Sequence, residues 1–162
     1  SLDTHADHEG NHLRFQAAIW DRIASLLREF KAIPFGTGSL FDATTFMVSS
    51  EFARTPALDG SKGKDHNGLT NSVLFLGKGI QGGRVVGASQ LVSRATSPTG
   101  DPLHIASPFD IHTGLPTTDR PNARFLHPEN VAQTVAKLFG VEGQIGIPLD
   151  AYPAIPGILR TE

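Results

Sequence analysis

The segment from Ala43 to Ala88 predicts the central strands of this protein: it begins ATTFMVSSEFARTP (residues 43–56) and includes GKDHNGLTNSVLFLGKG (residues 63–79). Residues 44–48 (TTFMV) and 72–76 (SVLFL) are short, uncharged runs of β-branched and apolar side chains. Such runs are typical of strands that are covered on both faces. The sequence therefore predicts two neighbouring core strands joined by a polar loop, in an α/β architecture.

The loop between these strands carries the first candidate site residues. Glu51 follows the end of the first strand, which is where open α/β sheets place ligand-binding groups. Arg54, Asp65 and His66 come later in the same loop. Two interpretations are open: a site for metal and anions, or a plain surface in which Glu51 pairs with Arg54 and His66 is solvated.

The opening SLDTHADHEGNH (residues 1–12) is also rich in metal-ligand side chains. In an extended segment Asp3 and His5 point to the same face, so they can converge on one ion. His8 and His12 are four residues apart, and they either share a helical face or lie in a solvated first turn.

The rest of the chain predicts scaffold. Apolar side chains recur at three- and four-residue steps within residues 13–31, which predicts an amphipathic helix. A second helix begins at Pro128 and ends near Gly140, with an apolar face made of Val131, Val135, Leu138 and Phe139. Residues 92–122 are dense in Pro, Gly, Ser and Thr, which predicts a long surface excursion with a short strand or hairpin around 103–105, either a lid or specificity loop or a passive insertion. GKGIQGG matches neither the dinucleotide fingerprint nor the P-loop, so a tight connection between Leu76 and Val85 is favoured over a phosphate-binding loop. No domain boundary is evident, so residues 1–162 are predicted to form a single domain.

Composition excludes several classes of function. Charged residues are 19% of the chain and the net charge is −2, without a Lys/Arg run, so nucleic acid is not an expected partner. No stretch approaches the roughly 20 apolar residues of a membrane span. The absence of cysteine excludes disulfides, zinc–thiolate sites and a cysteine nucleophile.

The motifs SSEFARTP, GKDHN and LFLGKGIQGGRVVGAS, with LDTHADH upstream and HPENVAQTVAKLFGV downstream, resemble the sulfatase-like family called domain of unknown function 1501. That family is regarded as part of the alkaline phosphatase superfamily. The resemblance implies a mixed sheet flanked by helices, of which this chain is the carboxyl-terminal part. It also implies a divalent metal (zinc, calcium or magnesium) at the sheet edge.

Carried onto this chain, the family pattern implies a metal site of Asp3, His5, Glu51, Asp65 and His66, with Arg54 binding the anionic oxygens of a substrate. Two departures stand out. Phe52 follows Glu51 where the pattern has a histidine, and no segment matches the strand that carries the nucleophile. No catalytic residue is therefore assigned within this chain, and an amino-terminal half is expected to be missing.

Two functions follow from the resemblance. The first is the metal-bearing part of a hydrolase of sulfate or phosphate esters, with an anionic ester as substrate. The alternative is a non-catalytic sulfatase-like module that binds a protein or polysaccharide. The resemblance also suggests a periplasmic or secreted location.

Overall fold

The computed structural model describes residues 3–94, 101–119 and 121–161, and these residues form a mixed α/β structure. The chain has two compact units. The first comprises Ser1–Lys78 and Leu91–Ile105, and the second comprises Gly79–Gln90 and Ala106–Glu162. The single domain expected from the sequence stays a prediction.

The first unit contains the long helix α1, Leu13–Ala32, which confirms the helix predicted for residues 13–31. A π-helical turn, η1 (His8–His12), leads into it, and the side chain of Asp7 caps η1 by accepting a hydrogen bond from the Gly10 amide. The apolar stripe of α1 is only half-buried, and no residue of α1 is buried. The stripe is Phe15, Ile19, Ile23, Leu27 and Phe30.

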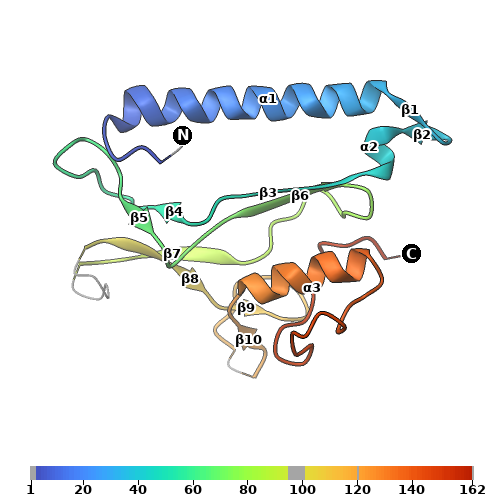
Figure 1. The fold of residues 1–162 in the computed structure, drawn as a ribbon. Helices are drawn as coiled ribbons and strands as arrows, with labels where there is room; N and C mark the ends of the chain where they lie inside the picture. The colour runs from blue at the N-terminus through green and yellow to red at the C-terminus, as the bar shows by residue number, and fades with distance from the viewer. Residues whose placement is uncertain (1–2, 95–100, 120, 162) are drawn as a thin grey trace. The chain divides into compact units, whose positions relative to one another are not determined.

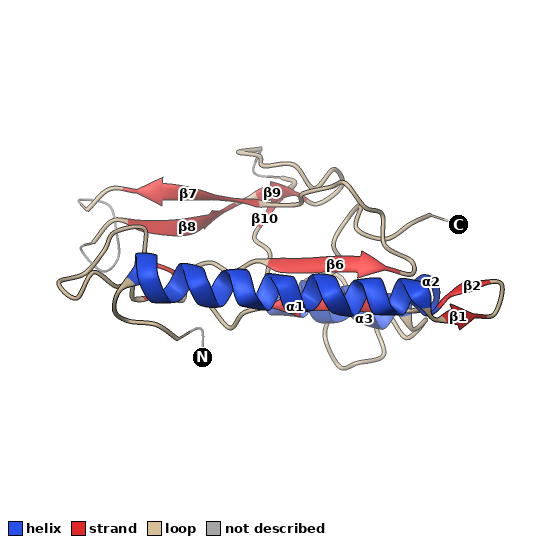
Figure 2. Cartoon of the chain, turned by 90° about the horizontal axis from the view of Figure 1, so that it is seen from above, coloured by secondary structure: helices blue, strands red, loops and turns tan. Residues whose placement is uncertain are grey.

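The two predicted central strands are neighbours, as expected. Strand β3 (Thr45–Ser49) pairs antiparallel with β6 (Val73–Gly77), with Met47 opposite Phe75. Helix α1 runs along this ribbon (Figures 1 and 2), and the Phe30 ring meets the Phe46 ring edge-on at 5.1 Å.

The prediction that both strands are buried was wrong. The side chains of β3 alternate between exposed and half-buried, with Met47 49% exposed, and β6 is half-buried except at Leu74, which is 43% exposed. The physical reason is that the ribbon has two strands only, and α1 packs against one of its faces. Uncharged sequence alone does not distinguish such a ribbon from the centre of a large sheet.

The other strands are short and also lie in pairs. The pairs are β1 (Pro34–Phe35) with β2 (Gly38–Ser39), β4 (Ala53–Arg54) with β5 (His66–Asn67), β7 (Ala88–Val92) with β8 (Leu103–Ser107), and β9 (Phe109–Asp110) with β10 (Ala123–Arg124). A short helix α2 (Leu40–Ala43) follows β2. Strand β8 confirms the strand predicted around residues 103–105, whereas residues 95–100 and 120 of the predicted excursion lie outside the described residues. Among the strands of the described ranges no sheet has more than two, so the larger mixed sheet implied by the resemblance is not among them.

The second unit is built around helix α3, Pro128–Leu138, which begins after His127 and stops before Gly140 (φ 70°), as predicted. In the predicted apolar face of α3, Val131, Val135 and Leu138 are half-buried. The buried residues of α3 are Asn130, Gln133, Thr134 and Ala136, whereas Phe139 is 78% exposed. The reason is the tail that follows, which passes beside α3 (Figure 1) and offers backbone groups that need polar partners.

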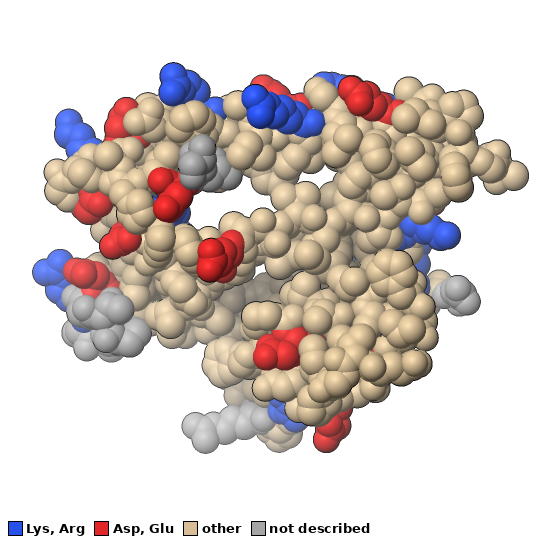
Figure 3. All heavy atoms as spheres, viewed as in Figure 1, with Lys and Arg blue, Asp and Glu red and all other residues tan. Residues whose placement is uncertain are grey.

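The surface over α1 carries charges of both signs. Arg14, Asp21, Arg22, Arg28 and Glu29 are all exposed, and Figure 3 shows basic and acidic side chains interspersed along this surface. No helix within the described ranges is long and apolar enough to cross a membrane.

Candidate metal centre

The hairpin of β4 and β5 forms the base of the candidate site in the first unit. The two strands pair so that Arg54 lies opposite His66. The next residue, Asn67, is 1% exposed, and its side-chain amide donates to the His104 carbonyl at 2.8 Å and to Thr70 Oγ1 at 3.1 Å. A buried, hydrogen-bonded asparagine therefore fixes the strand on which His66 stands.

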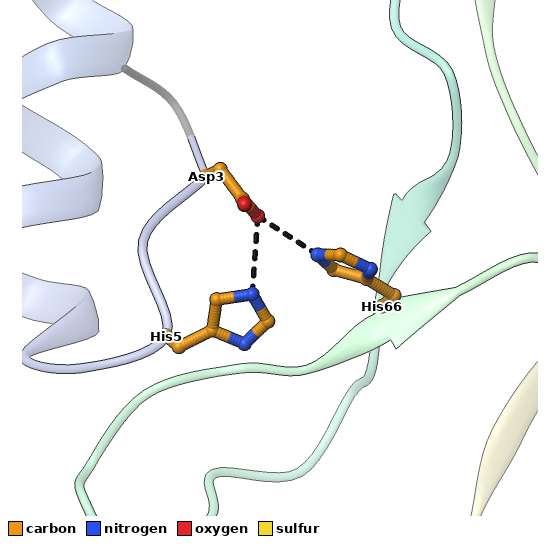
Figure 4. A group of neighbouring side chains, drawn as sticks. All are labelled: Asp3, His5 and His66. Carbon is orange, nitrogen blue, oxygen red and sulfur yellow. Dashed lines mark hydrogen bonds and ion pairs between the residues drawn. The ribbon is translucent and has the colours of Figure 1, made fainter.

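Three side chains converge on one oxygen of Asp3. Oδ1 lies 2.8 Å from His66 Nε2, 2.8 Å from Arg54 Nη2 and 3.1 Å from His5 Nε2. Figure 4 shows Asp3 and His5 reaching from the segment before α1 toward His66 on β5. Residues far apart in the sequence thus meet around a single carboxylate.

The neighbours of Asp3 keep its carboxylate ionised. The hydrogen bond from His66, and then that from Arg54, lowers the pKa of Asp3 from 3.8 to about 2. Arg54 is the most enclosed member, with only 15% of its side chain exposed against 55% for Asp3, and its Nη1 donates to the Lys64 carbonyl at 3.1 Å. The guanidinium is therefore held in place while the carboxylate stays open to solvent.

Asp3, His5 and His66 each offer one metal-ligand atom, and these atoms all lie within 4.8 Å of one another. Two ligands of a tetrahedral zinc ion are separated by about 3.4 Å, because each metal–ligand bond is about 2.1 Å. The contacts of Asp3 with the two imidazoles, at 3.1 and 2.8 Å, are close to that separation. Two of the three separations within the group are therefore compatible with a shared ion.

The other residues expected at the site lie outside this group of three. Asp65 Oδ1 is 3.5 Å from His5 Nδ1 and accepts a hydrogen bond from the His66 amide at 2.8 Å. Glu51 is exposed and is not a member of the group. Phe52, in place of the histidine in the family pattern, packs its ring against that of His66 at 3.9 Å. Whether Glu51, Asp65 and the three clustered residues bind metal stays a prediction.

The histidine pair of η1 is separate from the group. The rings of His8 and His12 stack at 4.9 Å, and His12 Nδ1 lies 2.8 Å from Thr4 Oγ1. Stacked imidazoles direct their nitrogen lone pairs outward within the ring planes, so the stack itself forms no shared ligand site.

Sequence reasoning missed the turn that touches the ligand segment, Asp59-Gly60-Ser61-Lys62-Gly63. One oxygen of Asp59 accepts hydrogen bonds from the Ser61 amide at 2.8 Å and from the Gly63 amide at 2.9 Å. The contact with the Ser61 hydroxyl, followed by the Gly63 amide, lowers the pKa of Asp59. The signal was available, because Asp, Gly and Ser in close succession are typical of a turn closed by an aspartate side chain.

Comparison with known proteins gives one match. The family described as "Protein of unknown function (DUF1501)" matches residues 1–139. No curated protein and no solved structure matches significantly. Because the matched residues make up most of the 162, the chain belongs to the DUF1501 family, a family of unknown function.

Proposed function

We propose that Asp3, His5 and His66 bind a divalent metal ion in a hydrolase that acts on sulfate or phosphate esters. The observation that supports the proposal is the convergence of one carboxylate and two imidazoles within 4.8 Å. Calcium and magnesium prefer oxygen ligands, whereas imidazole suits zinc and other transition metals. The donor set therefore favours zinc or a similar ion.

Each residue has a distinct part in this proposal. Asp3 supplies the negative charge, and its lowered pKa extends that charge to more acid pH. Arg54 already contacts the Asp3 carboxylate, and a guanidinium is suited to the oxygens of an anionic ester. A bound metal would supply polarisation of such an oxygen and a lowered pKa of a hydroxyl nucleophile.

The wider assignment rests on the resemblance to sulfatase-like proteins. We propose that the chain contributes the carboxyl-terminal part of an alkaline phosphatase-like domain in a periplasmic or secreted protein. Because no segment matches the nucleophile strand, this chain alone is expected to leave phosphate and sulfate monoesters intact. Glu51 and Asp65 stay candidate ligands in that larger site.

A second candidate function is a non-catalytic module that binds a protein or polysaccharide. The packing of Phe52 against His66 favours it, because an aromatic ring stands where the family pattern expects a further metal ligand. The two functions differ in their dependence on metal. Only the first requires that Asp3, His5 and His66 act together on an ion.

The direct test is a calorimetric titration of the chain with Zn²⁺, repeated with Co²⁺, whose visible absorption reports imidazole ligation. We expect one ion per chain, bound at least about tenfold more weakly by Asp3→Asn and by His66→Ala, because each loses a ligand. His112→Ala is the matched control, since His112 is an exposed histidine of the other unit. Absence of binding, or equal affinity in all variants, would overturn the metal proposal and leave the binding module.

A further inference from the structure

The segment that carries Asp3 and His5 is tied to a loop far along the chain, residues 59–63. The Ser61 hydroxyl lies 2.6 Å from the His5 carbonyl oxygen. Beyond His5, the Asp7 amide donates to the Ser61 carbonyl at 3.3 Å, and the His8 amide donates to the Lys62 carbonyl at 2.8 Å. The 59–63 loop therefore contacts the backbone of the chain from His5 to His8. Asp3 lies two residues before the first of these contacts.

Asp59 holds the loop in the shape that makes these contacts. Its Oδ1 accepts from the amides of Ser61 and Gly63 and lies 2.6 Å from the Ser61 hydroxyl. Because a serine hydroxyl has one proton, that proton is shared between Asp59 and the His5 carbonyl. Ser61 thus links the loop's own aspartate to the backbone of a metal-type ligand.

Gly63 provides the space that His5 needs. A Cβ built on Gly63 would lie 1.9 Å from the His5 carbonyl oxygen and 2.2 Å from its carbon. The φ angle of Gly63 is outside the left-handed region, so the requirement is for space and not for an unusual torsion. A Cβ on Gly60, in the same loop, would meet no atom within 4 Å.

Two residues with an unfavourable, positive φ angle lie at the same contact. Among the described non-glycine residues, Asp7 (φ 49°) and Lys62 (φ 58°) are the two with positive φ. They lie on the two sides of the hydrogen bond between the His8 amide and the Lys62 carbonyl. Such conformations persist where the surrounding contacts hold them, often beside functional sites.

We propose that the 59–63 loop is a positioning element for His5, with Ser61 and Gly63 as its positioning residues. The loop holds the backbone at His5 so that its Nε2 meets Asp3 and its ring lies beside that of His66. The proposal rests on the metal site proposed above for its effect on metal affinity. Its effect on the His5 ring itself does not depend on metal.

The experiment compares Gly63→Ala with Gly60→Ala in the full chain. Gly63→Ala is expected to lower Zn²⁺ affinity by about 10–100-fold, the range for residues that orient metal ligands, whereas Gly60→Ala retains the wild-type affinity. In metal-free protein, the His5 and His66 rings are 4.6 Å apart between centroids, and proton NMR should show an Overhauser contact between them. That contact is expected to weaken in Gly63→Ala and to persist in Gly60→Ala.

A second pair of variants protects the test if Gly63→Ala fails to fold. Ser61→Ala is expected to weaken both Zn²⁺ binding and the ring contact, and Ser61→Thr, which keeps a hydroxyl, restores them. A merely structural role would lower the melting temperature of Ser61→Ala without this selective rescue of affinity.

The outcomes separate the two proposals. If wild type binds Zn²⁺ and the Gly63 and Ser61 variants bind it equally well, the positioning role is overturned and the metal site stands. If wild type binds no Zn²⁺, the metal proposal fails, and the ring contact alone decides the positioning role: its loss in Gly63→Ala supports the role, and its persistence overturns it.

Discussion

The two units each hold a polar cluster, and the clusters are built in opposite ways. In the first unit, Asp3, His5 and His66 are exposed and contact one another through their side chains. In the second unit, Asn130, Gln133 and Thr134 are 4% exposed or less and bind backbone groups.

The buried cluster forms hydrogen bonds with backbone groups of the tail that follows α3. Asn130 donates to the Pro153 carbonyl, and Gln133 donates to the Ile147 carbonyl and accepts from the Gly143 amide. Thr134 accepts from the Ile155 amide. The tail lacks regular secondary structure over most of its length, so α3 supplies the partners that a sheet or helix would have given.

Burial and the type of partner distinguish a stabilising cluster from a candidate site. A buried side chain that binds backbone is needed by the fold, because its loss leaves a group that water cannot reach. An exposed carboxylate surrounded by imidazoles has partners that water or an ion can replace. The first cluster is therefore expected to govern ligand binding, and the second to govern stability.

The largest expected effect is on stability, from Thr134→Val. This change keeps the shape of the side chain but removes the oxygen that accepts from the buried Ile155 amide at 2.8 Å. We expect the free energy of unfolding to fall by about 1–3 kcal/mol, the cost of an unsatisfied buried donor, with Zn²⁺ affinity unchanged. Urea denaturation measures the first quantity and calorimetry the second.

Thr113→Val is the matched control, because Thr113 Oγ1 also accepts from a backbone amide, that of Leu115 at 3.4 Å, but in an exposed position. Water can replace that bond, so the change is expected to lower stability by less than about 0.5 kcal/mol. Equal losses in the two variants would break the distinction between buried and exposed clusters.

The sequence predicted local elements better than it predicted burial. Apolar periodicity located α1 and the strands β3 and β6 to within a residue or so, because period and length are local properties. It did not predict the burial of Gln133 and Thr134 on α3, because these side chains bind backbone groups 14 to 21 residues later. It also predicted wrongly that the two central strands are buried. The sequence of one strand does not reveal how many strands its sheet contains.

Part of the candidate site could be predicted from the sequence for a similar reason. Asp3 and His5 alternate along an extended segment, and His66 stands in a motif rich in ligand types, so residue chemistry pointed to them. Arg54 was identified in the same way, but its place opposite His66 depends on the hairpin register. The contacts of residues 59–63 with His5 are made largely by backbone atoms, and those leave little trace in the amino-acid pattern.

Of the two clusters, only the exposed one of Asp3, His5 and His66 should make a contribution to stability that is lost in acid. The pKa of Asp3 falls from 3.8 to about 2 on folding, so its ionised contacts with His66, Arg54 and His5 stabilise the protein above pH 3.8. That contribution is lost as the pH falls from 3.8 toward 2. The difference in unfolding free energy between wild type and Asp3→Asn is therefore expected to shrink as the pH falls below 4.

The buried cluster supplies the reference for this measurement. Asn130, Gln133 and Thr134 do not titrate, so the difference between wild type and Thr134→Val should stay constant over the same pH range. Asp42, Asp59 and Asp110 also have lowered pKa values, and each difference cancels their contribution because both proteins in a pair contain them. A pH-independent difference for Asp3→Asn would contradict the role given to its carboxylate.

The smallest expected effects come from Asp65→Asn and Glu51→Gln, which test how far the exposed cluster extends. Asp65 Oδ1 lies 3.5 Å from His5 Nδ1, the ring atom opposite the one that approaches Asp3, so it can favour the tautomer that leaves Nε2 free for metal. That distance is long for a hydrogen bond and the side chain is 70% exposed, so we expect Zn²⁺ affinity to fall by only about 3–10-fold in Asp65→Asn, at or below the low end for such partners.

Glu51 is exposed and outside the group, and Glu51→Gln is expected to stay within about twofold of wild type in Zn²⁺ affinity, since exposed charges beyond contact are screened. If Glu51→Gln instead weakens binding as much as Asp3→Asn, the ligand set must include Glu51, and the site forms only after a rearrangement of the residues after β3.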